Sequence, residues 1–339
     1  MLCLDVVQII CDFSDLKTQI KLIGLCKEYD EYLKIRKLTC TKFKNPQITQ
    51  EILRQNKFNR LQQLDASNNS EITDVNHLCN TLKELNCSGN CGIKQKGFSE
   101  LKYLQILDTY DNNEIINVNH LYNTLIELNC SDDCGLDQKG IMLCKYLQKL
   151  NVNNNNKITK LDHLQNTLIQ LFCDGYCGID QQEISKLKCL QVLGASDNKK
   201  IIDVNHLRNT LTELSCQGNC DIDQEGITEL KCLQILDAEN NSKITNVNHL
   251  CNTLKELCCQ EDCGIKQRGI SKLNCLQKLD ATGNKKIKDV NHLRDTLKEL
   301  YCGNTCGISQ KGISQLKCLK TLYSFGNKKI TEMITDSNI

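Results

Sequence analysis

The sequence predicts an α/β solenoid, in which short parallel strands stack along one axis. A 43-residue period runs without slip from Leu61 almost to the end of the 339-residue chain. Within each period, leucines and small apolar residues alternate with polar ones, which is typical of a short strand with one buried face. A single unit of this size cannot bury its apolar face alone, so neighbouring units must stack.

The period consists of two half-repeats of 21 and 22 residues. Each half has leucine at its first and fourth positions and a small apolar residue at its sixth, which is cysteine in the second halves and often alanine in the first. The first halves begin at Leu61, Leu104, Leu147, Leu190, Leu233, Leu276 and Leu319, and the second halves at Leu82, Leu125, Leu168, Leu211, Leu254 and Leu297. The sixth-position cysteines are Cys87, Cys130, Cys173, Cys216, Cys259 and Cys302.

The second halves resemble the leucine-rich repeat family, whose units read Leu-x-x-Leu-x-Leu-x-x-Asn/Cys-x-Leu. Leu82, Leu85, Cys87, Cys91 and Ile93 fill this pattern, with one extra residue before the Asn/Cys position. The resemblance implies a leucine-rich repeat solenoid, a curved parallel β-sheet of about 13–14 half-repeats of 21–22 residues. Because the units are short, 3₁₀ turns or extended segments are expected on the outer side.

A column of asparagines lies close to the Asn/Cys position of the first halves. A buried asparagine at this place is expected to bond to the backbone of the next coil and so to satisfy polar groups where the chain turns. The members of the column are Asn69, Asn112, Asn155, Asn198, Asn241, Asn284 and Asn327.

Residues 1–34 do not follow the repeat and are predicted to form a small N-terminal helical segment. Apolar residues from Val6 to Phe13 form one helical face, and those from Leu16 to Leu25 form a second, with Asp15 as its N-cap. A third short helix is expected over residues 27–34. Three such helices are too few for a stable core of their own, so they should lean on a partner or on the solenoid.

This segment resembles an F-box. The matching residues are Leu4-Asp5-Val6-Val7, Ile9-Ile10, Phe13, Asp15-Leu16, Leu22 and Leu25-Cys26-Lys27-Glu28-Tyr29. The chain departs from the family at Cys3, where a proline is common, and at Tyr29, where a tryptophan is common. The resemblance implies that Val7, Ile10, Leu16 and Leu22 dock a Skp-type adaptor. The alternative is a plain helical cap that shields the first strand of the array.

These patterns divide the chain into an F-box-like segment (1–34), an N-terminal capping half-repeat (35–60), the repeats (61–334) and a tail (335–339). In the capping half-repeat, Ile35, Leu38 and Cys40 keep the first, fourth and sixth spacing. We expect Pro46 to stretch this unit and a helical turn to follow near residues 49–53. At the other end, Met333 and Ile334 are expected to cover the last coil.

Composition excludes several classes of protein. The formal net charge is +1, which gives no electrostatic case for nucleic acid or an anionic membrane as a partner. No stretch approaches the ~18 apolar residues of a membrane span, and the first residues do not form a signal peptide. The 24 cysteines are therefore expected to be reduced in the cytoplasm and to pack as small hydrophobes.

No catalytic or metal-binding motif is evident. All six histidines occupy the same slot of successive 43-residue units, about 10 Å apart at the strand spacing, which is too far for one zinc ion. The same separation excludes disulfides along the cysteine column. No unit breaks the pattern with converging polar groups, so neither an enzyme nor a cofactor is predicted. The histidines are His77, His120, His163, His206, His249 and His292.

The exposed positions of the strands should form a concave binding face. The fifth position of the half-repeats is mostly Asp or Asn in the early repeats and then becomes variable, with several aromatic residues. Exposed aromatic side chains are frequent interface anchors, although neutral drift in a duplicated array explains the variation equally well. The candidate target-binding residues are Tyr110, Phe172, Tyr301, Tyr323 and Phe325.

The leading hypothesis is therefore a protein-interaction scaffold, a substrate-recognition subunit of a cullin-type ubiquitin ligase. The N-terminal helices would dock the adaptor and the solenoid would present a target protein. The alternatives are a repeat-only binding or regulatory protein whose helices merely cap the array, and a secreted adhesion-type protein. Residue usage and repeat style also look similar to leucine-rich repeat proteins of large DNA viruses, which implies the host cytoplasm.

Overall fold

The computed structural model describes residues 3–45 and 47–331. It divides into two compact units, unit 1 (Met1–Ile158) and unit 2 (Thr159–Ile339). The expectations for Pro46, Met333, Ile334 and the tail at 335–339 fall outside the described residues. None of the helices in the described part of the chain combines the length and the apolar character needed to cross a membrane.

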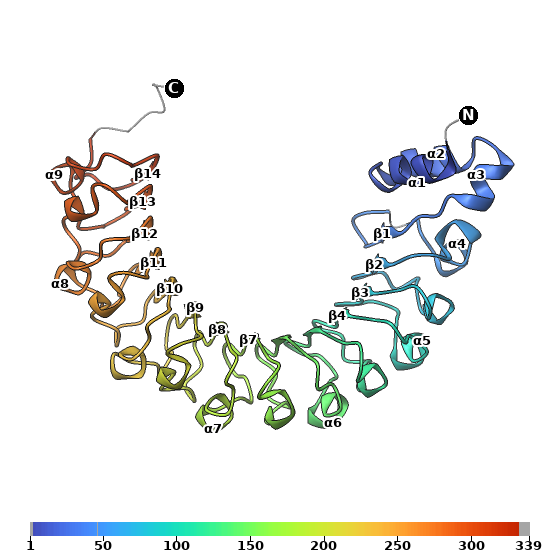
Figure 1. The fold of residues 1–339 in the computed structure, drawn as a ribbon, viewed down its shortest axis with the longest axis horizontal. Helices are drawn as coiled ribbons and strands as arrows, with labels where there is room; N and C mark the ends of the chain where they lie inside the picture. Colours follow the sequence, from blue (N-terminus) through green and yellow to red (C-terminus); the bar gives the residue numbers. More distant parts are fainter. Residues whose placement is uncertain (1–2, 46, 332–339) are drawn as a thin grey trace. The chain divides into compact units, whose positions relative to one another are not determined.

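The strands form a parallel ladder in each unit, and each strand pairs with its neighbours in chain order (Figure 1). The central leucines face one another in the register, as in Leu64 with Leu85 and Leu85 with Leu107. Unit 1 contains β1 (Lys37–Thr39), β2 (Gln63–Asp65), β3 (Glu84–Asn86), β4 (Ile106–Asp108), β5 (Glu127–Asn129) and β6 (Lys149–Asn151). Unit 2 contains β7 (Gln170–Phe172), β8 (Val192–Gly194), β9 (Glu213–Ser215), β10 (Ile235–Asp237), β11 (Glu256–Cys258), β12 (Lys278–Asp280), β13 (Glu299–Tyr301) and β14 (Thr321–Tyr323).

Short helical turns lie on the side opposite the strands (Figure 1). The 21- and 22-residue spacing predicted 3₁₀ turns or extended segments there, and the α-turns depart from that expectation. The first halves carry 3₁₀ turns, and most of the second halves carry a single α-turn. The α-turns are α4 (Gln50–Leu53), α5 (Gln95–Phe98), α6 (Gln138–Ile141), α7 (Gln181–Ile184), α8 (Gln267–Ile270) and α9 (Gln310–Ile313). The 3₁₀ turns are η1 (Asn56–Phe58), η2 (Asn76–Leu78), η3 (Asn119–Leu121), η4 (Asp162–Leu164), η5 (Asn205–Leu207), η6 (Glu225–Ile227), η7 (Asn248–Leu250) and η8 (Asn291–Leu293).

The core of each unit is a set of columns that repeat from coil to coil, where a coil is one half-repeat. The central strand leucine, the isoleucine or leucine of the turn and the sixth-position residue are all buried. The sixth-position cysteines, such as Cys87 and Cys216, have no exposed surface. They pack as small apolar residues, which confirms the role predicted for them. All 24 cysteines of the chain lie in the described residues as free thiols.

The asparagine column binds adjacent coils together, but it bonds to the preceding coil and not to the next one. Asn241 is typical, since its Nδ2 donates to the carbonyl oxygens of Cys216 (2.8 Å) and Ile222 (3.1 Å). Its Oδ1 accepts from the backbone N–H of Lys243 at 2.9 Å. The amide thus satisfies two buried carbonyls and one partly buried N–H at once. The same arrangement occurs at Asn69, Asn112, Asn155, Asn198, Asn284 and Asn327.

A lysine column follows the asparagines and also reaches the preceding coil. The Nζ of each lysine donates to the backbone carbonyl of a cysteine at the Asn/Cys position, for example Lys286 to Cys263 at 2.7 Å. These bonds hold the ammonium groups at one edge of the stack. The other members are Lys157, Lys200, Lys243 and Lys329.

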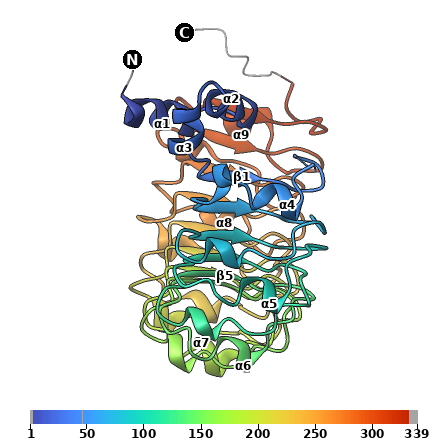
Figure 2. The same cartoon turned by 90° about the vertical axis from the view of Figure 1, so that its right-hand side faces the viewer.

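The N-terminal segment forms three helices, α1 (Leu4–Asp12), α2 (Leu16–Ile23) and α3 (Lys27–Tyr32), beside β1 at the end of unit 1 (Figure 2). Asp15 caps α2 by accepting from the N–H of Thr18 at 2.9 Å, as predicted. A buried amide pair fastens α1 to the chain that enters β1. Gln8 donates its Nε2 to the carbonyl of Lys34 and accepts the N–H of Lys34, both at 2.9 Å.

Candidate functional site

The N-terminal helices expose a group of large apolar side chains, which we call the N-terminal apolar surface. Phe13 follows the last turn of α1 and is 90% exposed, and Ile9 and Ile10 on α1 are about half exposed. Val6 on the same helix is also exposed. Ile20 of α2 and Leu25 add to the exposed apolar area of the segment. Apolar residues grouped in this way on a surface mark interaction sites more often than scattered ones do.

The four predicted adaptor-binding residues have different environments. Ile10 is 46% exposed and belongs to the N-terminal apolar surface, whereas Val7 is only 4% exposed. Leu16 and Leu22 are half-buried. Helix α1 leans on the rest of unit 1 through the face that carries Val7 and Cys11, so Val7 is turned away from solvent.

Ile9 and Phe13 offer more exposed area than the residues predicted from the F-box resemblance. Both lie in the predicted apolar helical face. The sequence could not show which residues of that face lean inward, because the pattern only shows that the face is apolar.

Three of the predicted target-binding residues come together on the strand side of unit 2. Tyr301 and Tyr323 are register partners on β13 and β14, and their rings stack with centroids 4.6 Å apart and planes 10° from parallel. Phe325 follows two residues after Tyr323 and is 93% exposed. Lys278 lies over the Tyr301 ring at 5.9 Å. We call Tyr301, Tyr323 and Phe325 the aromatic end of unit 2.

The other two predicted residues lie apart from this group. Phe172 is on β7, six strands from β13, which is about 29 Å at the usual strand spacing. A Cβ atom on its register partner Gly194 would come within 2.9 Å of the Phe172 ring, so glycine leaves room for this side chain. Tyr110 is exposed in unit 1. The five residues therefore do not form one patch.

Acidic side chains precede the aromatic end on the strands of unit 2. One ligand atom each from Asp237, Glu239 and Cys258 lies within 4.8 Å of the others, the one metal-ligand cluster among the described residues. The oxygens of Asp237 already accept from amides, with Gln217 Nε2 at 2.6 Å. Burial raises the pKa of the Cys258 thiol and so favours its protonated form, which is a poorer metal ligand than the thiolate. Burial and the nearby carboxylates also raise the pKa of Glu239. This arrangement is an acidic surface and not a built metal site.

The histidine column has a structural role in unit 2. The Nε2 of His206 lies 2.9 Å from the carbonyl oxygen of Ile184 in the preceding coil, and His249 and His292 repeat this contact at 3.0 Å. Partial removal of the rings from water lowers the pKa of His206, His249 and His292. Each of these rings therefore joins two coils.

One unit does break the repeat with converging polar groups, which corrects the expectation that none does. Five equivalent positions at 43-residue spacing are glycine, but this one is Glu183, which has no exposed side-chain surface. Its Oε1 accepts from the Nζ of Lys160 (2.9 Å) and of Lys186 (2.8 Å). Its Oε2 accepts from the N–H of Leu161 at 2.9 Å. The glycines are Gly97, Gly140, Gly226, Gly269 and Gly312.

Glu183 replaces a backbone contact made in the other coils. There the glycine carbonyl accepts the equivalent N–H, as in Val118 to Gly140 at 2.9 Å. Burial opposes ionisation of Glu183, but the bonds from Lys186, Leu161 and Lys160 outweigh it and lower the pKa of the carboxyl. Because both oxygens are bonded and enclosed, this group stabilises the coil and is not placed for acid–base chemistry.

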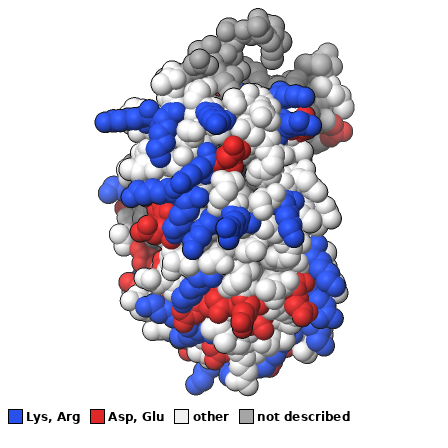
Figure 3. All heavy atoms as spheres, turned by 90° about the vertical axis from the view of Figure 1, so that its left-hand side faces the viewer, with Lys and Arg blue, Asp and Glu red and all other residues white. Residues whose placement is uncertain are grey.

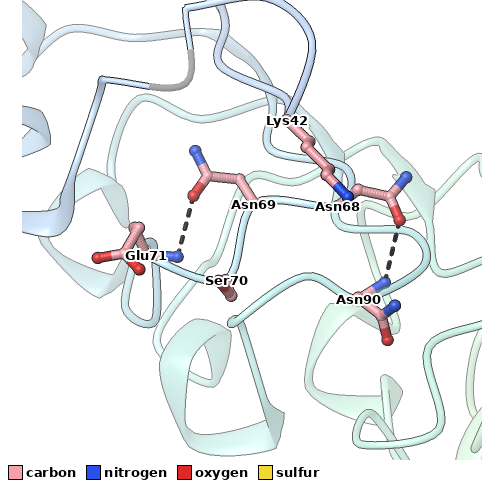
Figure 4. A pocket seen from close by; sticks show the side chains of 6 residues that line it. All are labelled: Lys42, Asn68, Asn69, Ser70, Glu71 and Asn90. Carbon is pink, nitrogen blue, oxygen red and sulfur yellow. Dashed lines mark hydrogen bonds between the residues drawn. The ribbon is translucent and has the colours of Figure 1, made fainter.

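A polar hollow of about 340 Å³ lies on unit 1 (Figure 4). Lys42 and Glu71 are its charged lining residues. Asn68 accepts the N–H of Asn90 at 3.3 Å, and Asn69 accepts the N–H of Glu71 at 3.0 Å. These amides are already committed to the turns between coils, so the hollow follows from the repeat geometry. Its described lining contains one hydroxyl, that of Ser70, and one carboxylate, that of Glu71, and so no carboxylate pair.

Solved structures share this fold. An internalin (inlF) from Listeria monocytogenes is 21% identical, with 97% of this chain and 89% of that chain covered and a TM-score of 0.54. The functional domain of InlJ from Listeria monocytogenes, described as including a cysteine ladder, is 26% identical with a TM-score of 0.53. That alignment covers 82% of this chain but only 60% of the InlJ chain. Rad7, solved in complex with Elc1 in yeast, is 13% identical, with 98% and 90% covered and a TM-score of 0.55.

No protein-family model matches the chain, and no curated protein matches it either. The parallel strand ladders, the 21- and 22-residue coils and these structural neighbours establish the fold as a leucine-rich repeat solenoid.

Proposed function

We propose that this chain is a non-catalytic binding scaffold, a substrate-recognition subunit of a cullin-type ubiquitin ligase. The N-terminal helices dock a Skp-type adaptor and the repeats hold a target protein. In this role the chain only brings the target close to the ligase, so it needs no catalytic residue. The assembly would operate in the cytoplasm, which is the host cytoplasm if the chain is viral.

The N-terminal apolar surface is the observation that carries this proposal. A helical segment that merely closed the end of the array would present a polar outer face. Here the inner face, with Val7 and Cys11, is buried, and the outer face still exposes Ile9, Ile10 and Phe13. Two apolar faces on one short helix indicate that α1 both covers the array and binds a partner. The Rad7–Elc1 structure is a complex of a protein that shares this fold.

Binding of a purified Skp-type adaptor to the full chain tests the docking role. We expect Ile9→Asp with Phe13→Asp to weaken binding more than tenfold, because burial of each large apolar side chain contributes about 1.5–3 kcal/mol. Calorimetry would measure the change. Ile116→Asp, at an exposed isoleucine elsewhere in unit 1, is the matched control and should bind normally.

The repeat-only alternative predicts the opposite result. The bonds between Gln8 and Lys34 and the burial of Val7 favour it, because they fasten α1 to the chain that enters β1. If the adaptor does not bind the wild-type chain, or if the double variant binds as well as the control, the helices are only a cap and the ligase role is wrong.

For the target, we propose that the aromatic end of unit 2 is the main contact. Its two stacked tyrosines and exposed Phe325 are aromatic residues of the kind that dominate interfaces. A photo-crosslinking residue at position 323 should join the chain to its target in cells. Loss of that product in Tyr301→Ser and Phe325→Ser variants supports the assignment. The same crosslinker at Tyr176, an exposed tyrosine of unit 2 away from the aromatic end, is the control. Equal capture of one protein at both positions would contradict it.

A further inference from the structure

Charge is strongly segregated along unit 2, although the whole chain has a formal charge of +1. Residues 159–263 contain 9 Lys and Arg and 16 Asp and Glu, a formal charge of −7. Residues 264–331 contain 14 Lys and Arg and 4 Asp and Glu, a formal charge of +10. The near-neutral total is therefore an average of two opposite stretches, and it hides a basic region that would meet the usual electrostatic criterion for an anionic partner.

The basic side chains gather on the helical turns α8 and α9, on residues that flank α8, and on the loops that follow β12 and β14. Figure 3 shows the face that carries α8 and α9, with Lys and Arg crowded over its upper part and Asp and Glu gathered lower down. Hydrogen bonds from side chains and from the backbone place these turns side by side. Gln267 of α8 donates its Nε2 to the carbonyl of Asp289 at 2.7 Å and accepts the N–H of Lys288 at 2.9 Å. The N–H of Gln310 in α9 donates to the carbonyl of Lys329 at 2.9 Å.

We call the exposed Lys and Arg residues of α8, α9 and the neighbouring loops the basic turn surface. Its exposed members are Lys266, Arg268, Lys272, Lys285, Lys286, Lys288, Lys311, Lys328 and Lys329.

Few of these charges are balanced within the described residues. Lys286 and Lys329 donate to backbone carbonyls, which fixes two ammonium groups without neutralising them. The ion pairs in this stretch involve Arg294, Lys317 and Lys278, and none of those three belongs to the basic turn surface. Like charges held together in this way repel one another, and an anion with several charges relieves the repulsion.

We propose that the basic turn surface binds the phosphate backbone of a nucleic-acid duplex without reading its sequence. Protein interfaces are depleted in lysine and need apolar anchors, but this surface consists of eight lysines and one arginine around polar turns. Single-stranded nucleic acid is usually held by stacked aromatic side chains. The exposed aromatic residues of 264–331, Tyr323 and Phe325, belong to or follow strand β14 and not the basic turns. Phosphate contacts from lysine and arginine need neither feature.

A fluorescent 24-base-pair duplex titrated with the full chain tests this proposal. We expect binding that weakens steeply with salt, because each phosphate contact releases counterions, with a slope of about −0.9 per contact for DNA. The triple variant Lys285→Glu, Lys288→Glu and Lys311→Glu should bind at least tenfold more weakly and show a smaller slope. The triple leaves Lys286 in place because its bond to Cys263 supports the fold.

The matched control makes the same change of charge in the acidic stretch of the same unit. Lys188→Glu, Lys199→Glu and Lys231→Glu replace three exposed lysines there and should leave most of the affinity. Circular dichroism checks that both variants fold. Equal weakening by the two triples, or no duplex binding at low salt, overturns the proposal.

Two competitors separate the other anionic partners. Phosphatidylserine vesicles that bind the chain while the duplex does not would assign the surface to a membrane. Polyglutamate that displaces the duplex at equal charge concentration would assign it to an acidic protein. Either result overturns the assignment to nucleic acid. The adaptor role of the N-terminal helices does not depend on the outcome, because different residues carry it.

Discussion

The repeats and the N-terminal helices use apolar residues in opposite ways. The central strand leucines from Leu64 to Leu300 are at most 2% exposed. In contrast, Ile9 and Ile10 of α1 are about half exposed, and Phe13, which follows α1, is 90% exposed. A coil inside either unit is covered by a neighbouring coil on both sides, whereas the described residues place a neighbour on one side of the N-terminal helices only. The difference teaches that a neighbouring coil buries the apolar side chains in this fold. An exposed apolar surface therefore marks a place where a partner is missing.

The largest effect on stability should come from a change in the buried core of the repeats. Leu214→Ala removes a fully buried strand leucine between two coils, and we expect a loss of about 2–5 kcal/mol in the free energy of unfolding because a cavity remains. Chemical denaturation followed by circular dichroism measures it. A loss below 1 kcal/mol would mean that the coils collapse around the cavity and that the columns are less tightly packed than described.

The second prediction concerns Glu183, whose buried carboxylate replaces a backbone contact made in the other coils. Glu183→Gln should cost about 2–3 kcal/mol, because Lys160 and Lys186 lose their shared carboxylate partner. The folded-state pKa of Glu183 is lowered, so its contribution to stability is present above the unfolded pKa and is lost as the pH falls through the folded pKa. Denaturation from pH 7 to pH 3 should therefore show a weaker acid dependence in the variant than in wild type. An unchanged pH profile would contradict the ionised assignment.

The asparagine column should show an intermediate effect. Asn241→Ala leaves the carbonyls of Cys216 and Ile222 and the N–H of Lys243 without their partner, for an expected cost of about 1–3 kcal/mol. Thermal or urea unfolding gives the value. Asn219→Ala, at an exposed asparagine of the same unit, is the control and should change stability by less than about 0.5 kcal/mol. Similar losses of stability for the two variants would show that the bonds of the asparagine column do not hold the coils together.

The smallest effect on stability should come from the N-terminal apolar surface. Phe13→Ala removes a ring that is 90% exposed, so the free energy of unfolding should change by less than about 0.5 kcal/mol. The same denaturation assay applies. A loss as large as that of Leu214→Ala would mean that Phe13 is packed in solution, and the contrast between the two regions would fail.

The repeats were predictable from sequence because one period controls several columns at once. The strand leucines, the cysteine core, the asparagine ladder and the Asp15 cap follow from spacing and residue type. Spacing could not show that the asparagines bond to the preceding coil, since both neighbours offer identical carbonyls. The buried role of Glu183 was not predicted, because in the sequence a carboxylate in a glycine column resembles a surface substitution. Only the structure shows its lysine partners.

The surfaces were less predictable than the core. The apolar pattern of α1 does not reveal which side leans on the array, so Val7 and Ile10 seemed equivalent. The aromatic residues of the fifth position were all candidates for target binding, but the sequence did not show which of them lie together. Strand order separates Phe172 from the pair at Tyr301 and Tyr323. Net charge concealed the basic turn surface because opposite stretches cancel in the sum.

The one-way bonding of the asparagine column has a consequence for how such a chain can change over time. Each 43-residue unit reaches back to carbonyls that every unit provides, and it offers the same carbonyls to the unit that follows. Recombination between repeats of the gene can therefore add or delete a whole unit while every buried amide still finds its acceptors. Length becomes a freely adjustable property of the protein, and the exposed positions of each new copy are available for selection without risk to the core.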